Sequence, residues 1–267
     1  MSKIVLITGS TRGIGFGLAR EFLKRECSVV ISSRTQDAVT SAVQTLTQEF
    51  EAARVFGFPC DVAQYAQVEA LWDAAQKHFG RIDIWINNAG IGHPDIPFWE
   101  LPPAQIEQVV DINLIGTMYG TRVALNGMRK QGSGYIYMME GFGSTGRTRP
   151  GLSVYGSTKA AIYYFSQALL PDTANAPVKI GSLSPGMVVT DFVSDQYKGR
   201  ESEYQRAKDA FNLFGDRVET VTPWLADNVL KNEKTGARFQ WLTTGKFFGR
   251  LLTSRFRKRN LFDEPAE

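Results

Sequence analysis

Tyr155 and Lys159 are the residues whose types and spacing point most directly to chemistry. They lie four positions apart in "YGSTK", inside a run whose pattern predicts a helix over 154–171. Residues i and i+4 share one helix face, so the phenol and the ammonium group would be neighbours. A carbonyl under reduction needs a proton donor, and a phenol with a pKa of about 10 is a slow one. A lysine at about 4 Å would lower that pKa by about three units. The pair therefore suggests proton transfer, although the same spacing is common on helices that catalyse nothing.

A glycine-rich turn, "TGSTRGIG" at 8–15, lies between the first predicted strand and the first predicted helix. Glycine allows a tight turn and a close approach of backbone to a pyrophosphate, while the helix N-terminus supplies N–H groups. The position between strand and helix favours a dinucleotide site over a purely structural turn. The predicted contacts are Gly9, Ser10, Thr11, Arg12, Gly13, Ile14 and Gly15.

The end of the second predicted strand indicates which dinucleotide binds. An acidic residue there would hold a ribose 2′-hydroxyl, but this strand ends with Ser33 followed by Arg34. Arg12 adds a second cation, and each charge-assisted hydrogen bond contributes about 1.5–3 kcal/mol. We therefore expect NADP(H) as the cofactor. The alternative is that both arginines are solvated surface charges.

The elements that must position these residues follow a regular alternation. The predicted strands are 3–9, 28–33, 54–61, 82–90, 134–140, 178–186 and 237–243. The predicted helices are 14–26, 36–52, 65–79, 103–131 and 154–171. Alternating strands and helices imply a parallel sheet covered by helices on both faces, and right-handed crossovers make it doubly wound. We expect an α/β, Rossmann-like fold with one domain over 1–244.

Two regions fit this alternation poorly. Residues 187–235 run long between strands, and we expect them to form a lid over the substrate. Residues 245–267 form a C-terminal extension that is basic and amphipathic over 245–260. Such a segment can lie on a membrane surface as a peripheral contact. The alternative is a helix docked on the domain or at a subunit interface.

Composition restricts the remaining classes. The net charge of +3 does not predict a nucleic-acid partner. No apolar stretch approaches the roughly 18–20 residues of a membrane span. Cys27 and Cys60 fall in apolar strand-like runs and are expected to be buried free thiols, which favours a cytoplasmic or similar reducing compartment. His78 and His93 lack metal-ligand spacing, so no metal is predicted.

Together these motifs resemble the short-chain dehydrogenase/reductase family over about residues 3–190. The resemblance adds Asp61–Val62, "NNAG" (87–90), Asn113 and "SPGMVVTD" (184–191) to the turn and the tyrosine motif. It implies that Tyr155 is the proton donor, that Lys159 tunes it and binds the nicotinamide ribose, and that Asn113 holds a relay water. It also implies a homodimer or homotetramer. The implied cofactor contacts are Asp61 and Val62 at the adenine, Asn88, Ala89 and Gly90 beside the cofactor, and Pro185, Gly186, Val188 and Thr190 at the nicotinamide.

One position departs from that family. Its catalytic serine usually precedes the tyrosine by 13 residues, where this chain has Phe142. The preceding strand ends with Glu140 and Gly141, where two serines are common. We expect Ser144 to polarise the carbonyl instead, unless that role is filled otherwise. The remaining hydroxyls are expected to begin or pack the helix, with Ser153 as its N-cap and Ser157 and Thr158 in packing.

The departure itself resembles a sub-family. "MEGFGS" followed by "VYGSTK" looks like the corresponding segment of chlorophyll b reductases, which reduce the C7 formyl group with NADPH. We therefore expect an NADPH-dependent carbonyl reductase whose substrate is a small carbonyl compound or a lipophilic pigment. A reductase of smaller ketones, steroids or acyl groups is the alternative, and a non-catalytic NADP(H)-binding regulator is another. Arg147 and Arg149 could meet a substrate carboxylate or ester, or be solvated.

Overall fold

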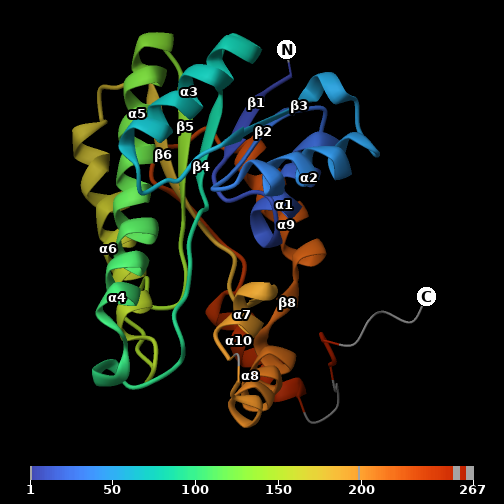
Figure 1. Ribbon diagram of the computed structural model, residues 1–267, viewed down its shortest axis with the longest axis vertical. Helices are drawn as coiled ribbons and strands as arrows, with labels where there is room; N and C mark the ends of the chain where they lie inside the picture. The colour runs from blue at the N-terminus through green and yellow to red at the C-terminus, as the bar shows by residue number, and fades with distance from the viewer. Residues whose placement is uncertain (1, 198, 255–258, 263–267) are drawn as a thin grey trace.

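The computed structural model describes residues 2–197, 199–254 and 259–262, and over these ranges seven parallel strands form one sheet in the order β3-β2-β1-β4-β5-β6-β9 (Figure 1). The strands are β1 Ile4–Ile7, β2 Ser28–Ser33, β3 Val55–Pro59, β4 Ile84–Asn87, β5 Gly134–Met139, β6 Val178–Ser184 and β9 Ala237–Gln240. A separate two-stranded ribbon pairs β7 Val188–Val189 with β8 Asp216–Arg217. The predicted doubly wound fold is confirmed, and each predicted strand is present, β2 with the predicted bounds and the other six with shorter ends.

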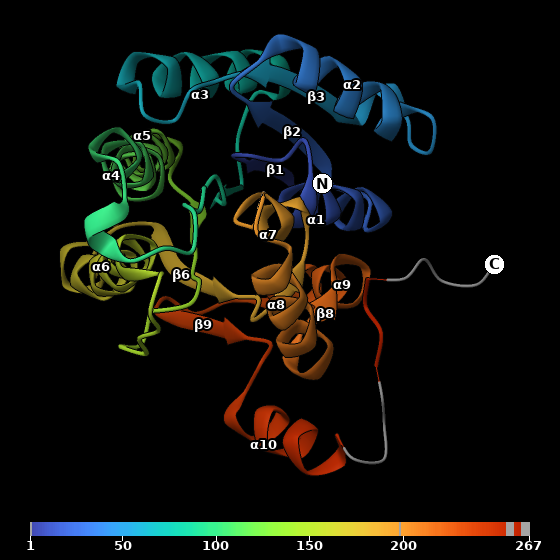
Figure 2. The same ribbon diagram turned by 60° about the horizontal axis from the view of Figure 1, so that its bottom comes forward.

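Helices cover both faces of this sheet (Figures 1 and 2). On one face lie α1 Gly13–Lys24, α2 Gln36–Thr47 and α9 Val218–Lys231, and on the other lie α3 Tyr65–Phe79, α5 Gly116–Gln131 and α6 Ser153–Asp172. Successive residues of β1 face opposite layers, with Val5 and Ile7 in one core cluster and Leu6 in the other. All three are fully buried, as expected for a parallel strand covered on both sides.

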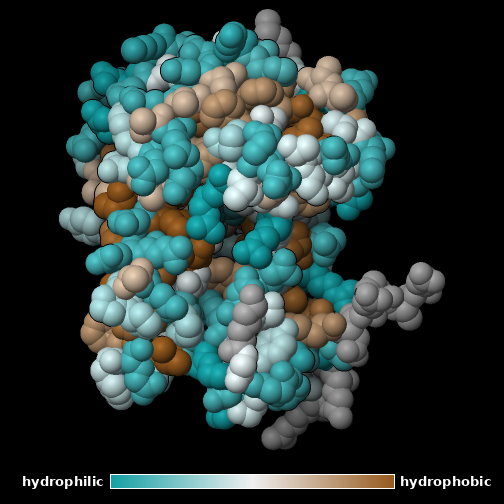
Figure 3. Space-filling view, in the orientation of Figure 1, coloured by the Kyte–Doolittle hydropathy of each residue, from teal (hydrophilic) through white to brown (hydrophobic). Residues whose placement is uncertain are grey.

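The carboxyl ends of the strands bring the glycine turn, "NNAG" and "SPGMVVTD" together at one edge of the sheet. Strand order reverses between β1 and β4, and ligands of open α/β sheets bind at such a reversal. The remaining α-helices are α4 Pro103–Val110, α7 Asp191–Asp195, α8 Glu201–Phe214 and α10 Thr244–Thr253. In the space-filling view, hydrophobic residues reach the surface in the band between the sheet and α7–α8 (Figure 3).

Two predicted helices differ from the observed ones. The helix expected over 36–52 ends at Thr47, and a 3-10 turn follows at Ala52–Arg54. Its last turn contains Thr45 and Thr47, whose hydroxyls bond back to carbonyls of the preceding turn, and such local bonds compete with helix continuation. The region expected over 103–131 is continuous but changes type, because a π-helix at Asp111–Ile115 joins α4 to α5.

The region expected as a lid, 187–235, divides into two parts. Residues 191–197 and 199–214, which include α7 and α8 and which we call the lid, lie over the carboxyl edge of the sheet. By contrast, α9 packs in the core against α1 and fully buries Val221, Leu225 and Ala226. In the C-terminal extension, α10 is described as far as Thr253, and the predicted basic residues at 255–258 lie outside the described residues. Among the helices that are described, none is long and apolar enough to cross a membrane.

Candidate active site

The glycine turn has the backbone that a pyrophosphate cradle needs. Gly9 and Gly13 adopt φ of +63° and +57°, a region that L side chains rarely occupy. A Cβ at Gly15 would collide with the carbonyl oxygen of Gly9 and lie 2.5 Å from Asn88 Nδ2. Side chains are therefore excluded where the turn meets the start of α1, and the residues present fit a dinucleotide phosphate.

The "NNAG" segment holds this turn in place. Asn88 Nδ2 donates to the carbonyl oxygens of Thr8 and Gly9, both at 2.9 Å. Thr8 Oγ1 accepts the backbone N–H groups of Asn88 and Ala89, both at 3.1 Å. These four bonds tie the end of β4 to the end of β1, so the two strands on either side of the topological switch form one rigid wall.

A cavity of about 520 Å³ extends from this wall to the lid. Of the predicted cofactor contacts, those that line it are Gly9, Thr11, Arg12, Gly13, Ile14, Gly15, Ser33, Arg34, Asp61, Val62, Asn88, Ala89, Gly90, Tyr155, Lys159, Pro185, Gly186, Val188 and Thr190. Ser10 lies elsewhere: it is fully buried, donates to the carbonyl of Ile7 at 2.6 Å and accepts the N–H of Ser32 at 2.9 Å. Its hydroxyl joins β1 to β2 behind the turn.

The two arginines expected at the cofactor phosphate differ in their surroundings. Arg34 follows β2 and is exposed at the cavity rim. Arg12 faces the lid, with its guanidinium 3.5 Å from Asp195 and 3.8 Å from Asp191 of α7. Both of these ion pairs are largely exposed, so they contribute little stability. The Arg12 guanidinium can therefore pair either with the carboxylates of Asp191 and Asp195 or with an anionic ligand.

Tyr155 lies in the first turn of α6, and its backbone is held by a histidine. The helix begins at Ser153, and Leu152 occupies the N-cap without a side-chain hydrogen bond, so the prediction of Ser153 as N-cap is wrong. His93 Nε2 accepts the backbone N–H of Tyr155 at 3.2 Å. The imidazole thus satisfies an N–H group that an N-cap side chain would otherwise accept.

Lys159 is 4% exposed and lies one turn along α6 from Tyr155. Its Nζ donates to the carbonyl oxygen of Met139 at 3.1 Å and lies 5.7 Å from the centre of the Tyr155 ring. Burial lowers the pKa of Lys159 to about 8, and the negative charge of Glu140 opposes this effect. Burial also raises the pKa of Tyr155, opposite to the direction expected from sequence, because that expectation omitted desolvation.

Asn113 stands in the π-helix between α4 and α5. Its Oδ1 accepts the N–H of Ile91 at 2.8 Å, and its Nδ2 donates to the carbonyl of Ile91 at 2.9 Å and to Thr158 Oγ1 at 3.2 Å. A Cβ at Gly90 would lie 3.3 Å from Asn113 Oδ1 and 3.6 Å from Lys159 Nζ. Asn113 is therefore separated from Lys159 by the glycine of "NNAG". π-Bulges of this kind recur at functional sites.

Ser144 does not line the cavity with Tyr155 and Lys159. It is buried, and its Oγ accepts the backbone N–H of Gly141 at 3.1 Å. Phe142 lines the cavity where the family's serine would stand, and Gly141 lies directly against the phenol. A Cβ at Gly141 would collide with the Tyr155 hydroxyl.

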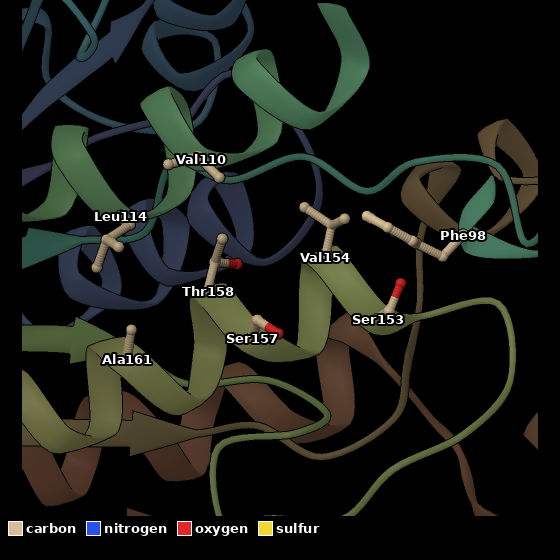
Figure 4. A pocket seen from close by; sticks show the side chains of 8 residues that line it. All are labelled: Phe98, Val110, Leu114, Ser153, Val154, Ser157, Thr158 and Ala161. Atoms are coloured by element: carbon tan, nitrogen blue, oxygen red, sulfur yellow. The ribbon is translucent and has the colours of Figure 1, made fainter. Parts of the chain in front are cut away.

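The three hydroxyl residues that were predicted to begin or pack α6 line a second pocket on another side of the helix (Figure 4). Ser153, Ser157 and Thr158 line it together with apolar residues such as Val110. Thr158 also donates to the carbonyl of its own helix at Tyr155, at 2.7 Å. Their positions agree with packing roles and separate them from the cavity that contains the Tyr155 phenol.

Several cavity residues carried no functional prediction from sequence. The lid contributes an aromatic wall that includes Phe192 and Phe214, and the Phe192 ring lies 5.6 Å from that of Tyr155. Arg149, which was expected either to meet a substrate carboxylate or ester or to be solvated, instead forms an ion pair with Asp95, whose carboxylate also accepts the Tyr197 hydroxyl at 2.8 Å. This bridge ties the lid to the loop after β4. The signal that could have found it is the cluster of lid aromatics, whereas Asp95 has no distinguishing local pattern.

Both cysteines are free and buried, which confirms the prediction of unpaired thiols. Burial raises the pKa of Cys27, and it raises the pKa of Cys60 to about 12. Within the described ranges, no group of three or more His, Cys, Asp or Glu side chains is arranged to hold a metal ion.

Known proteins resemble this chain in sequence and structure. A probable chloroplastic chlorophyll(ide) b reductase of Oryza sativa subsp. japonica is 35% identical over 278 residues, covering 98% of this chain and 54% of that protein. A second chloroplastic chlorophyll(ide) b reductase of the same plant is 38% identical over 230 residues, covering 84% and 66%. The chain thus spans less than two thirds of either relative. The crystal structure of 3-ketoacyl-(acyl-carrier-protein) reductase from Brucella melitensis, complexed with NADH, has a TM-score of 0.77 at 25% identity and covers 92% of this chain and 98% of that one.

The fold, with its glycine turn at the switch point of the sheet, places the chain in the class of dinucleotide-binding α/β proteins. The sequence pattern described as short chain dehydrogenase matches residues 3–201. The chain belongs to the short chain dehydrogenase family, as the resemblance of its motifs implied.

Proposed function

We propose that this protein is an NADPH-dependent carbonyl reductase with Tyr155 as the proton donor. The observation that carries the proposal is the placement of the phenol and the Lys159 ammonium in one cavity with the glycine cradle. The cofactor, when bound, supplies the hydride. Tyr155 donates its proton to the carbonyl oxygen as that oxygen gains negative charge. Because burial raises its pKa, Tyr155 remains protonated at neutral pH, as an acid must be.

Lys159 has two parts in this proposal. Its ammonium binds the nicotinamide ribose, as in the family, and it stabilises the phenolate that remains after proton transfer. A nearby positive charge favours the charged form of a phenol. Asn113 completes the set as the site of a relay water next to Lys159. The carbonyl of Met139 accepts one of the three hydrogens of Lys159 Nζ and so orients the ammonium for these two roles.

We propose an indirect role in the reaction for Ser144. For direct contact with a carbonyl its hydroxyl would have to reach the cavity, yet it is buried and accepts the N–H of Gly141. We infer that Ser144 holds the glycine against which the Tyr155 phenol rests. Tyr155 is then the hydroxyl group that both polarises and protonates the carbonyl oxygen.

The preference for NADPH rests on the residues after β2. Ser33 and Arg34 line the cavity and bring no carboxylate to the ribose that carries the phosphate. Arg34 is exposed, so its guanidinium can meet a 2′-phosphate without breaking a buried contact. Arg12 lies across the glycine turn and would add a second cation. Guanidinium and phosphate form strong, directional hydrogen bonds.

For the substrate we propose a formyl group on a large conjugated ring, the C7 formyl of chlorophyll b. Two features support this choice: the resemblance to proteins named chlorophyll(ide) b reductase, and the aromatic side of the cavity. The aromatic residues there are Phe142, Phe192, Phe211 and Phe214. Flat aromatic surfaces pack well against a conjugated ring. Arg149 lines the same cavity, and a carboxylate or ester of the substrate would have to replace Asp95 as the partner of its guanidinium.

The experiment is a reduction assay with detergent-dispersed chlorophyll b and NADPH, followed by absorption and chromatography. The wild type should form the 7-hydroxymethyl product. Tyr155→Phe should slow it by about 10²–10⁴-fold without loss of NADPH binding. No product despite confirmed NADPH binding would exclude the pigment, and activity on a panel of smaller aldehydes and ketones would then identify a different carbonyl substrate. Turnover by Tyr155→Phe at the wild-type rate would exclude the proposed donor.

Association is proposed at two surfaces. The exposed side of α10 carries Phe248, Leu251 and Leu252, which would give the peripheral membrane contact expected for 245–260. We also propose a homodimer or homotetramer, as the family resemblance implies. Exposed aromatics at Phe98 and Trp99, beside the pocket on the outer side of α6, support such contacts. The free thiols favour a reducing compartment, the cytoplasm or one like it.

A further inference from the structure

The end of β5 is anchored by a buried carboxylate. Glu140 follows the last residue of this strand, and its side chain is 0% exposed. Ser182 of β6 donates its hydroxyl to Glu140 Oε1 at 2.8 Å. Arg238 of β9 donates to both carboxylate oxygens, at 2.8 and 2.7 Å. Partners of this kind compensate the lost hydration of a buried carboxylate, and they hold Glu140 across three neighbouring strands.

The residues on either side of Glu140 contact the Tyr155–Lys159 pair. The carbonyl of Met139 accepts Lys159 Nζ at 3.1 Å. Gly141 lies against the Tyr155 hydroxyl, and its added Cβ would come within 3.1 Å of Lys159 Cγ. The strand end that Glu140 anchors therefore fixes where both side chains stand relative to the sheet.

Lys159 is faced by few charged or titratable groups. Its own helix brings Tyr155, the end of β5 brings Glu140, and β9 brings Arg238 through that carboxylate. From the loop after β4, His93 hydrogen-bonds backbone groups of Tyr155 and Pro94. Among the described residues, Glu140 is the charge that raises the pKa of Lys159 against the effect of burial. A buried ammonium needs a counter-charge of this kind.

We propose that Glu140 is a positioning residue of the reaction, whose carboxylate, oriented by Arg238 and Ser182, serves as the counter-charge of Lys159. The inference rests on the proposed function, because that function gives Lys159 its part in the reaction. Arg238 partly neutralises Glu140, so the two residues act on Lys159 in opposite directions. Glu140 favours the charged ammonium, and Arg238 weakens that influence.

The test compares Glu140→Gln, Arg238→Gln and the double variant. Glu140→Gln should lower the pKa of Lys159 from its value of about 8, by about one unit. Arg238→Gln should raise it, because loss of the guanidinium charge leaves the influence of Glu140 on the ammonium uncompensated. The double variant should return close to the wild type. The readout is the ¹³Cε chemical shift of Lys159 against pH in lysine-labelled protein with no substrate present. The alkaline limb of kcat/KM should move with it.

The outcomes are distinct. A role confined to stability would lower the unfolding midpoint of both single variants and leave the Lys159 pKa unmoved, or move it in one direction for both, and either result overturns the inference.

Glu21→Gln is the matched control, because Glu21 is also buried and pairs with Arg25, yet lies on α1. If Glu140→Gln fails to fold, Arg238→Gln decides alone, since a fallen or unchanged pKa would exclude the counter-charge. Opposite pKa shifts without any carbonyl turnover would uphold the counter-charge and contradict the proposed function.

Discussion

The imidazole of His93 accepts the backbone N–H of Tyr155 at 3.2 Å through Nε2. Its Nδ1 lies 2.8 Å from the carbonyl oxygen of Pro94. A carbonyl oxygen can only accept, so Nδ1 carries the hydrogen and Nε2 offers the lone pair. Leu152, at the N-cap of α6, has no side-chain acceptor. A histidine from the loop after β4 thus performs the capping at the residue that bears the proposed proton donor.

His93→Phe should therefore impair both the helix and the reaction. The ring keeps most of its volume but leaves the Tyr155 N–H without an acceptor, which costs about 1 kcal/mol of stability. Displacement of Tyr155 should lower kcat by roughly tenfold or more, because small misplacements of reacting groups are costly. His93→Gln, which retains an acceptor, should recover part of both losses. Equal unfolding midpoints and equal rates for His93→Phe and the wild type would show that the cap is unimportant.

Local sequence pattern predicted the fold because each strand and helix is specified mainly by residues close together in the sequence. Alternation of strand and helix runs specifies a parallel sheet, and the position of Gly13 and Gly15 between the first two elements predicts the cradle. The contacts that tune the site are distant in sequence: His93 and Tyr155 are 62 residues apart, and Glu140 and Arg238 are 98 apart. No periodicity encodes such pairs, so they could not be predicted.

Burial of the site could not be read from local sequence pattern. In a partly screened medium the lysine charge would dominate the pKa of the Tyr155 phenol. In the folded protein Lys159 is almost fully buried, and desolvation dominates the pKa of both groups. Ser144 illustrates the same limit, since its spacing from Tyr155 was suitable but its hydroxyl faces Gly141.

Gly141→Ala should reduce both turnover and stability. Its Cβ would collide with the Tyr155 hydroxyl, so the phenol must move away from the strand end. Steric insertion of this size costs roughly 1–3 kcal/mol of stability, whereas kcat should fall by about 10²-fold. Steady-state kinetics and urea unfolding measure the two effects. Gly249→Ala on α10, where nothing lies within 4 Å of the added Cβ, is the control and should leave the rate unchanged. An active Gly141→Ala enzyme would contradict the contact.

Lys159 should make stability rise with pH in the alkaline range. Burial lowers its pKa in the folded state to about 8 from 10.5, so between these values the unfolded chain binds more protons than the folded one. Lys159→Met should abolish that rise and have a higher urea midpoint at pH 7. Burial of Cys27 and Cys60 acts in the opposite direction above about pH 9. The difference between wild type and variant isolates the lysine, and parallel midpoints from pH 7 to 10 would refute its depressed pKa.

Arg34 should distinguish NADPH from NADH more strongly than Arg12 does. Loss of one guanidinium–phosphate bond costs about 1.5–3 kcal/mol, so Arg34→Ala should weaken NADPH binding by about ten- to a hundredfold and leave NADH binding unchanged. Arg12 already faces Asp191 and Asp195, and Arg12→Ala should have a smaller effect. Fluorescence titration with both dinucleotides measures the ratio. Arg20→Ala, which removes an exposed ion pair with Glu49, is the control. Equal losses for both dinucleotides would contradict the preference for NADPH.

The exposed side of α10 should determine membrane binding. The helix is fixed to the lid by its other side, where Phe247 stacks on Phe214 at 4.2 Å between ring centres and Arg250 pairs with Asp216 at 2.7 Å. Phe248 and Leu252 point away from these contacts and are 56% and 76% exposed. A docked helix with an uncovered apolar side and no acidic residue over 245–260 suits an anionic lipid surface.

Phe248→Ser combined with Leu252→Ser should therefore reduce co-sedimentation with vesicles that contain anionic lipid by about tenfold or more, since each large apolar side chain contributes about 1.5–3 kcal/mol when buried. Trp99→Ser is the matched control, because Trp99 is 83% exposed but lies outside α10. Phe214 lines the cavity and stacks on Phe247, the neighbour of Phe248 in α10. The proposed membrane contact would therefore be linked to the cavity through Phe247 and Phe214. If the wild type does not co-sediment with the vesicles and the double variant differs from it only in oligomeric mass, α10 is a subunit interface instead.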